Sequence, residues 1–201
     1  MAGDSMAGER AANEQHARTE REKMLAGELY YSNDPELTER RLRTRERLAR
    51  LTASDPRNIA ARLAICGELF GSIGRNFWVE PPFFCDYGEN IRLGDNCFIN
   101  FNCTFLDVAP ITLGNNVLIA PGVQLLAAYH PIDHITRAKA LEYGSPITIE
   151  DDAWLGGGVI VLPGVRIGAR SIIGAGSVVT RDVPPDVIAV GNPCKVLRSV
   201  G

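Results

Sequence analysis

The sequence predicts a mainly β protein, in which a solenoid of short parallel strands follows an N-terminal α-helical segment. Two observations lead to this fold class. The composition changes near residue 72, because 15 of the 20 Gly and 10 of the 12 Pro lie after it, in a stretch rich in Val and Ile. The same stretch repeats itself about every 18 residues, and each repeat divides into units of six. A fixed period of this kind is typical of a solenoid, in which each coil packs only on its neighbours.

The repeat is clearest in four similar segments, 91–96, 111–116, 147–152 and 165–170, whose starts lie 20, 36 and 18 residues apart. Large apolar residues recur every six positions, three to a coil, which predicts a triangular cross-section. They are Ile73, Val79, Leu93, Ile99, Phe105, Leu113, Ile119, Leu125, Ile149, Leu155, Val161, Ile167, Ile173 and Val179. Small or β-branched residues four positions after many of these are expected to point inward as well. They are Cys97, Cys103, Val117, Val123, Val159, Val165, Ser171 and Ser177.

Departures from the regular repeat are expected at corners, because a strand that took up extra residues would break the ladder between coils. Eight-residue stretches at 85–92 and 105–112 predict corners with two extra residues. The interval of 36 residues equals one coil plus 18 further residues, which we expect to leave the solenoid as a loop at about 127–146. This loop contains His130 and His134, two of the three His in the chain. Loops on a rigid scaffold often carry function.

Before the solenoid, the sequence predicts a mobile tail over residues 1–23 and a helical segment over 24–72. A first helix is expected to begin at Asn33-Asp34-Pro35-Glu36, where a capping residue precedes Pro and an acid, and to run to about Leu51. Asp55-Pro56 repeats this signal and predicts a second helix. The apolar stripe expected on the second helix consists of Ile59, Leu63, Cys66 and Phe70.

The charge pattern disfavours some classes of partner. The 21 Lys+Arg and 24 Asp+Glu leave a net charge of -3, which provides no general attraction to nucleic acid or an anionic membrane. The six Arg between Arg40 and Arg50 are therefore interpreted as a solvated helix face. The longest nearly apolar run, 117–129, is too short to cross a bilayer, which takes about 20 residues. The first 23 residues contain no apolar segment typical of a secretory signal, so we predict a cytoplasmic location.

The five Cys form no CxxC pair and are an odd number, so the sequence suggests neither a disulfide framework nor a cysteine metal site. Cys97 and Cys103 lie six residues apart at inward positions, and we interpret them as stacked core thiols rather than as nucleophiles. No metal is predicted. A site with three His on neighbouring coils, as in the γ-type carbonic anhydrases, is implausible because the β part contains only His130 and His134.

Hexads of the form aliphatic-Gly-x-x-small-x resemble those of the hexapeptide-repeat acyltransferases, a family of left-handed parallel β-helices. Further motifs, in order along the chain, resemble the maltose and galactoside O-acetyltransferases, the branch that also includes nodulation acetyltransferases. These motifs are Met24–Tyr30, Trp78–Pro82, Asp86–Gly88, Asn100–Asn102, His130-Pro131 and Val190–Arg198. The resemblance implies a left-handed β-helix, transfer of an acetyl group from acetyl-CoA to a sugar hydroxyl, and a homotrimer with active sites between subunits.

The resemblance assigns His130 as the general base of acetyl transfer. An alcohol is a poor nucleophile at neutral pH, and a neutral imidazole is suited to take its proton as it attacks a thioester. The alternative is a structural His that hydrogen-bonds a turn. Three groups remain open as the partner that orients the imidazole, namely Glu142, Asp107 and a backbone carbonyl. His134 has no clear role.

For the acceptor, the resemblance implies sugar contacts by Asp86 and Asn100, and Asp107 lies close to another such position. The alternative for Asn100 is a residue that forms part of the ladder between coils. The match is uneven at two positions. Galactoside enzymes have an acid where this chain has Val108, and an Asp where it has Ser32, although the nearby Asp34 matches the maltose branch. Ser32 and Asp34 are therefore both candidate acceptor residues.

For coenzyme A, the resemblance implies a groove for the pantetheine arm and cations for the phosphates. The candidate residues are Trp154, Gly157, Ala175, Thr180, Arg181, Lys195 and Arg198. The run Gly156–Gly158 has no spacing typical of a phosphate loop, so it is interpreted as a place where a ligand approaches the backbone.

Two other functions stay open at this point. One is a hexapeptide acetyltransferase that acts on serine or on an antibiotic instead of a sugar. The other is a non-catalytic solenoid that serves as an assembly subunit, which would leave the His-Pro loop and the basic closing motif without a purpose.

Overall fold

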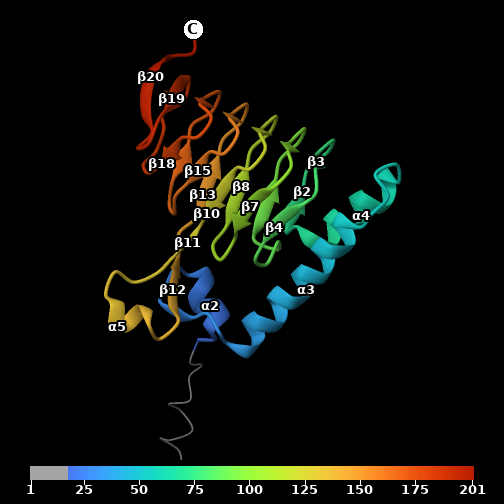
Figure 1. The fold of residues 1–201 in the computed structure, drawn as a ribbon, viewed down its shortest axis with the longest axis vertical. Coiled ribbons are helices and arrows are strands. Elements are labelled where there is room, and N and C mark those ends of the chain that lie inside the picture. Colours follow the sequence, from blue (N-terminus) through green and yellow to red (C-terminus); the bar gives the residue numbers. More distant parts are fainter. Residues whose placement is uncertain (1–17) are drawn as a thin grey trace, which may run out of the picture.

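The computed structural model describes residues 18–201, and residues 72–201 form a triangular parallel β-helix (Figure 1). The chain passes through three sheets in turn. The first sheet consists of β2 (Ser72–Ile73), β5 (Ile91–Leu93), β8 (Ile111–Leu113), β13 (Ile147–Ile149) and β16 (Arg166–Ile167). The second consists of β3 (Trp78–Val79), β6 (Phe98–Ile99), β9 (Leu118–Ile119), β14 (Trp154–Leu155), β17 (Ile172–Ile173), β19 (Val187–Val190) and β20 (Lys195–Ser199). The third consists of β4 (Phe83–Cys85), β7 (Cys103–Leu106), β10 (Gln124–Leu126), β15 (Ile160–Val161) and β18 (Val178–Val179). The predicted fold class, a β-helix after a helical segment, is confirmed.

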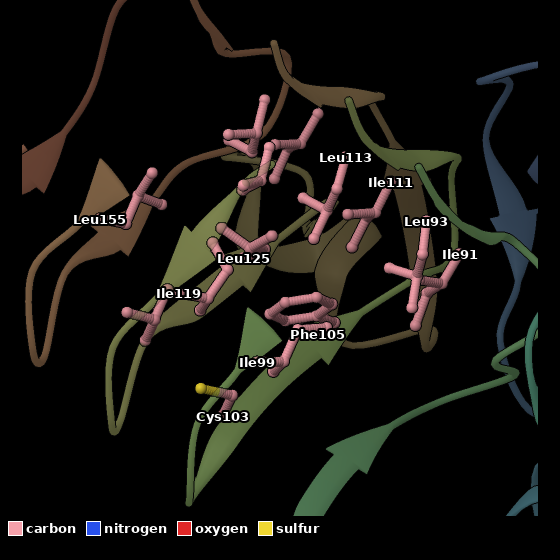
Figure 2. Close-up of a cluster of buried hydrophobic side chains, with 14 of the residues drawn as sticks. Ile91, Leu93, Ile99, Cys103, Phe105, Ile111, Leu113, Ile119, Leu125 and Leu155 are labelled. Carbon is pink, nitrogen blue, oxygen red and sulfur yellow. The ribbon is translucent and has the colours of Figure 1, made fainter. Parts of the chain in front are cut away.

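The predicted inward positions form the core of the β-helix. Of the residues expected to point inward at the two positions of each hexad, all but one are buried. Figure 2 shows how their side chains stack along the axis from one coil to the next. The exception is Ile73, which is 38% exposed because it lies in the first coil, where only α4 (Ile59–Leu69) covers it. Each fully buried aliphatic side chain contributes roughly 1.5–3 kcal/mol to folding, so the stack dominates the stability.

The irregular intervals are absorbed at corners, as predicted. Eight residues separate Cys85 from Leu93 and Phe105 from Leu113, and both intervals pass from the third sheet to the first. We call this edge of the prism the third–first corner; it consists of residues 86–90, 107–110, 162–165 and 180–182 and the extruded loop. In the loop, β11 (Ala128–Tyr129) and β12 (Leu141–Gly144) form an antiparallel pair joined through α5 (His134–Arg137).

Both ends of the β-helix are covered. At the start, α3 (Pro35–Thr52) and α4 contribute Leu48, Leu51 and Leu69 to the same core as the first coils. At the other end, β19 and β20 form an antiparallel hairpin that continues the second sheet. Open strand edges invite pairing with other chains, and these elements lie at the two ends where such edges occur.

The first helix begins as predicted, with Pro35 at its first position and the Asp34 carboxylate accepting the backbone N–H groups of Glu36 and Leu37. The second helix was placed wrongly. It begins at Ile59, and Asn58 is its N-cap, whereas Asp55-Pro56 forms only a turn.

The predicted buried face of the second helix is also wrong in part. Ile59 is 53% exposed, and Arg62 is buried although it is charged. The buried face consists of Arg62, Ile65, Cys66 and Leu69. The Arg62 guanidinium lies over the ring of Trp78, 5.3 Å from its centroid, and 3.8 Å from the Glu80 carboxylate. These two contacts make its burial possible.

Part of the predicted tail is helical. Residues 1–17 lie outside the described residues, but α2 (Glu20–Leu25) begins within the span assigned to the tail. Thr19 and Glu22 form a capping box that satisfies the first N–H groups of this helix. This helix has no apolar periodicity that would predict it, because it is short and polar and Met24 is its only buried residue.

A glycine in the stacked coils permits close approach of two backbones. A Cβ at Gly94 would lie 2.4 Å from the carbonyl oxygen of Gly114 on the next coil. We predict that Gly94→Ala lowers the free energy of unfolding by about 2–4 kcal/mol, because two coils must separate to admit the methyl group. The measurement is urea unfolding at a fixed protein concentration.

The matched control is Gly67→Ala in α4, where the nearest atom, Cδ1 of Ile73, lies 3.9 Å from the added Cβ. Helix propensity predicts that this variant is more stable than the parent by up to about 1 kcal/mol. Equal unfolding midpoints for Gly94→Ala and the parent would contradict the close stacking of the coils.

Candidate active site

A cavity of about 320 Å³ lies at the third–first corner. It is lined by Ser32, Asn33, Arg41, Arg45, Asp86, Tyr87, Val108 and Glu142. These residues come from the segment before α3, from α3 itself, from two successive coils at the third–first corner and from β12. The lining has two carboxylates and two guanidinium groups, so its formal charge is balanced.

The N-terminal segment and the extruded loop are joined by backbone pairing. β1 (Tyr30–Tyr31) pairs antiparallel with β12, with Tyr30 opposite Glu142. Figure 1 shows the loop extending from the β-helix to lie near α2. Residues more than 100 positions apart in the chain therefore meet at this corner.

His130 follows β11 at the start of the loop. Its Nδ1 lies 3.2 Å from the backbone carbonyl oxygen of Leu141. A carbonyl oxygen can only accept, so this contact requires the proton to be on Nδ1 and leaves the lone pair of Nε2 free. Of the three candidate orienting groups, the geometry thus favours a backbone carbonyl. The His130 side chain is 52% exposed, which leaves Nε2 accessible.

Glu142 connects His130 to the cavity. Its Oε1 lies 3.8 Å from Nε2 of His130, and its Oε2 accepts a 2.6 Å hydrogen bond from the hydroxyl of Tyr30. Tyr30 is 1% exposed. Burial, together with the hydrogen bond to Glu142, raises the pKa of Tyr30 well above its usual value, so its hydroxyl stays a donor throughout the physiological range.

Asp86 lies on the cavity wall and is partly buried. Burial raises the pKa of its carboxyl, and the positive charges of Arg41 and Arg45 oppose this effect. Arg41 is fixed in place, because it donates to the hydroxyl of Tyr87 and to the backbone carbonyl of Ser32, both at 2.8 Å. Ser32 itself donates from its hydroxyl to the carbonyl of Ala140.

Two predicted acceptor residues, Asp107 and Asp34, do not line the cavity, and their contact with an acceptor stays a prediction. The Asp107 carboxylate is fully buried and accepts backbone N–H groups of Asp86, Tyr87 and Asn90 at 3.0, 2.9 and 3.4 Å. It therefore fixes the corner that carries Asp86. Asp34 is occupied as the N-cap of α3. Both carboxylates, which were expected to bind a ligand, thus accept hydrogen bonds from backbone N–H groups.

Asn100 lies at a different edge of the prism. It follows β6 at the second–third corner, which consists of residues 80–82, 100–102, 120–123, 156–159 and 174–177. The 4 residues of β7 separate this corner from the third–first corner on the same coil, which is roughly 13 Å at ~3.3 Å per residue. Within one chain, Asn100 is therefore not brought together with His130.

The candidate coenzyme A residues lie in three places, namely on the second sheet, at the second–third corner and at the third–first corner. Trp154 is 49% exposed on the second sheet, and Gly157 and Ala175 lie at the second–third corner. Lys195 and Arg198 are exposed on β20 at the end of the second sheet. Thr180 and Arg181 lie after β18, at the third–first corner of a later coil.

The neighbourhood of Gly157 fits the approach of a ligand. A Cβ at Gly156 would lie 2.7 Å from the backbone nitrogen of Ala175, so that residue is required for stacking of the coils. A Cβ at Gly157 would meet nothing closer than 3.5 Å, so its missing side chain leaves open surface instead. An exposed indole, an open backbone and two exposed cations along one sheet match the apolar arm and phosphates of coenzyme A in chemical type.

Comparisons with known proteins agree with this architecture. Residues 23–74 match the maltose acetyltransferase hexapeptide capping motif, 90–127 the hexapeptide repeat of succinyl-transferase, and 146–181 the bacterial transferase hexapeptide of six repeats. The galactoside O-acetyltransferase of Escherichia coli is 43% identical over 179 residues, 89% of this chain and 88% of that protein. The chain belongs to the maltose and galactoside O-acetyltransferase branch of the hexapeptide-repeat acyltransferases.

Solved structures of this branch superpose closely. A maltose O-acetyltransferase from Clostridium difficile gives a TM-score of 0.90 at 47% identity, covering 92% of this chain and 100% of that one. A galactoside acetyltransferase in complex with coenzyme A gives 0.88 at 42% identity, covering 92% of each chain. The resemblance stated from the sequence motifs is confirmed.

Sequence reasoning missed several residues of this acyltransferase site. Arg41 and Arg45 were interpreted as part of a solvated helix face, yet both line the cavity. Their spacing of four residues places them on one side of a helix, which was a usable signal. Other Arg of the same run do form surface ion pairs, as in Arg43–Glu39 and Arg50–Glu68. Tyr30 was noted only as part of a family motif.

No group of three or more His, Cys, Asp or Glu among residues 18–201 is arranged to hold a metal ion. None of the helices in this range is both long and apolar enough to span a membrane.

Asp107 provides a pH-dependent test of the corner beneath the site. Burial raises the pKa of its carboxyl from 3.8 to about 7. The folded protein then binds one more proton than the unfolded chain between these two values, so the contribution of Asp107 to the free energy of unfolding decreases as pH rises through this window. We predict that Asp107→Asn flattens the dependence of unfolding free energy on pH between about 5 and 8, measured by urea unfolding.

The control is Asp133→Asn at the N-cap of α5. Hydrogen bonds from Thr136 lower the pKa of Asp133, so its titration falls outside this window. The control should leave the slope unchanged. Parallel pH profiles for the parent and Asp107→Asn would show that the buried carboxyl does not titrate there.

Proposed function

We propose that this protein transfers the acetyl group of acetyl-CoA to a hydroxyl of a sugar, with His130 as the general base. The observation that carries the proposal is the His130 geometry. Its Nδ1 donates to the carbonyl of Leu141, and its free Nε2 lies beside a carboxylate that lines a polar cavity. The names of the relatives, which include maltose and galactoside O-acetyltransferases, support a sugar acceptor.

The reaction follows from this arrangement. The acceptor hydroxyl transfers its proton to Nε2 while its oxygen forms a bond to the carbonyl carbon of the acetyl thioester. The tetrahedral intermediate then loses the sulfur of coenzyme A by cleavage of the C–S bond, and His130 returns the proton to that sulfur. The products are an acetyl ester, the free thiol and a neutral imidazole. No covalent enzyme intermediate is needed; the buried thiols of Cys97 and Cys103 have raised pKa values because of burial, which disfavours them as nucleophiles.

The cavity suits a polyhydroxylated acceptor. Asp86 and Glu142 supply carboxylates that accept hydrogen bonds from hydroxyl groups, and Arg41 and Arg45 supply donors. Polar groups of this kind discriminate by penalising an acceptor that leaves them unpaired. Ser32 completes the wall where the segment before α3 meets the loop.

We further propose that a complete site requires two chains of a homotrimer. Asn100, Trp154, Gly157 and Ala175 lie on the second sheet or at its edge, about one strand length from the corner that carries His130. If a neighbouring chain presents its second sheet to the third–first corner, its Asn100 and coenzyme A groove meet His130. Thr180, Arg181, Lys195 and Arg198 are the proposed polar contacts to the rest of coenzyme A. A cytoplasmic location stays a prediction.

The first test measures thiol release from acetyl-CoA with maltose, glucose, galactosides, serine, chloramphenicol or no acceptor. We expect release that depends on a sugar, and a loss of about 100- to 10,000-fold in kcat for His130→Ala, because a general base contributes about that much. The matched control is His134→Ala in the same loop, whose exposed side chain should be dispensable.

The outcomes separate the alternatives. Release only with serine or chloramphenicol would keep the chemistry and replace the acceptor class. Coenzyme A binding without thiol release would contradict every acceptor in the assay, and no binding at all would favour a non-catalytic assembly subunit. Full activity of His130→Ala would overturn the assignment of the base.

A second test addresses the two-chain site. We predict that His130→Ala and Asn100→Ala, each inactive alone, regain activity when co-expressed with different affinity tags and purified as mixed oligomers. In every trimer that carries both tags, one of the three sites combines an intact His130 with an intact Asn100 from a neighbour. Mixed oligomers as inactive as the single variants would place both residues in a site within one chain.

A further inference from the structure

We propose that Tyr30 is a positioning residue for catalysis: its buried hydroxyl holds the Glu142 carboxylate beside Nε2 of His130, where the negative charge stabilises the imidazolium formed during acetyl transfer. The inference rests on the proposed function. It gives a role to Tyr30 and Glu142, neither of which is the base or a nucleophile in the proposed reaction.

The two oxygens of Glu142 have different partners. Oε2 accepts the 2.6 Å hydrogen bond from Tyr30, and Oε1 lies 3.8 Å from Nε2 of His130. The hydrogen bond thus fixes the carboxylate so that its second oxygen faces the base. Tyr30 is 1% exposed and packs with Met24, Leu37, Tyr87 and Val108, so its own hydroxyl has little freedom to move away.

The contact between Glu142 and His130 changes character during the reaction. While His130 is neutral with its proton on Nδ1, a lone pair on Nε2 faces the carboxylate and 3.8 Å is too long for a hydrogen bond. Once Nε2 has taken the acceptor proton, a positive ring lies beside a negative carboxylate. The attraction therefore arises only after proton transfer has begun, and such an interaction raises kcat.

Burial makes this charge effective. The Glu142 side chain is 20% exposed, so water screens it only partly. The neutral Tyr30 donor leaves the full charge of the carboxylate in place, whereas an Arg or Lys partner would cancel it. A preorganised carboxylate also needs little reorganisation when the proton moves.

The hydroxyl comes from the N-terminal segment and not from the β-helix. Tyr30 lies on β1, and the pairing of β1 with β12 places it opposite Glu142. In the same segment, the Tyr31 backbone N–H donates to Glu20 of α2, which anchors the strand from its other side. The helical segment therefore contributes to the reaction itself as well as to the acceptor pocket.

The test is a double-mutant cycle with Tyr30→Phe, Glu142→Gln and the double variant, assayed by thiol release with the sugar that the parent accepts. We expect Glu142→Gln to lower kcat about tenfold or more, and Tyr30→Phe about five- to tenfold, with KM for acetyl-CoA changed less than about twofold in each. The double variant should match Glu142→Gln alone, because without the charge there is nothing for Tyr30 to position.

The matched control is Tyr31→Phe, which removes the hydroxyl of an exposed tyrosine on the same strand and should leave kcat unchanged. Losses that multiply in the double variant would overturn the proposal, because they would show that Tyr30 acts independently of Glu142. An unchanged kcat in Glu142→Gln alone would also overturn it. That variant keeps an acceptor for Tyr30, so this result does not depend on Tyr30→Phe folding well.

Failure of the proposed function has a different signature. A parent protein that releases no thiol with any sugar would contradict the sugar transferase itself, whereas a fully active parent with an additive cycle would contradict only the role of Tyr30. Thermal unfolding of each variant separates a loss of kcat from a loss of folded protein.

Discussion

The inward stacking of aliphatic side chains at equal register on successive coils is the constraint on which the rest of this structure depends. Leu93, Leu113, Ile149 and Ile167 follow one another along one sheet, each paired with the next through a parallel ladder. A strand of two or three residues cannot accept an insertion without moving a core residue to the outside. Variation in sequence length is therefore confined to corners, and the candidate site lies at the corner where most of that variation is gathered.

That corner combines three departures from the regular coil. The two extra residues at 86–90 carry Asp86, the similar extension at 107–110 supplies Asp107 to fix it, and the long loop brings His130 and Glu142. The N-terminal segment closes the cavity by pairing β1 with β12. The β-helix provides a rigid scaffold, and the residues of the candidate site lie on the segments that depart from its regular coils.

The sequence was sufficient for the features that depend on a repeating apolar pattern. It predicted the three-sheet β-helix, its core and the extruded loop, because period and polarity determine them. It was insufficient where a polar side chain has a choice of partners. Asp34 and Asp107 have the residue type expected of sugar ligands but bind backbone N–H groups, and Arg62 is buried because Trp78 and Glu80 receive it. Such choices depend on contacts between distant parts of the chain, which periodicity does not encode.

The balance of charge at the corner explains why so many ionisable groups can coexist there. Two carboxylates placed in a partly buried cavity repel each other, and the negative charge of Glu142 adds to the larger effect of burial in raising the pKa of Asp86. The positive charge of Arg41, which donates to Tyr87, Ser32 and Thr38, opposes this effect on Asp86. Glu142 is held by a neutral phenol instead of a cation. The site thus places one carboxylate beside the imidazole and another on the cavity wall, an arrangement that suits the proposed base catalysis on an alcohol.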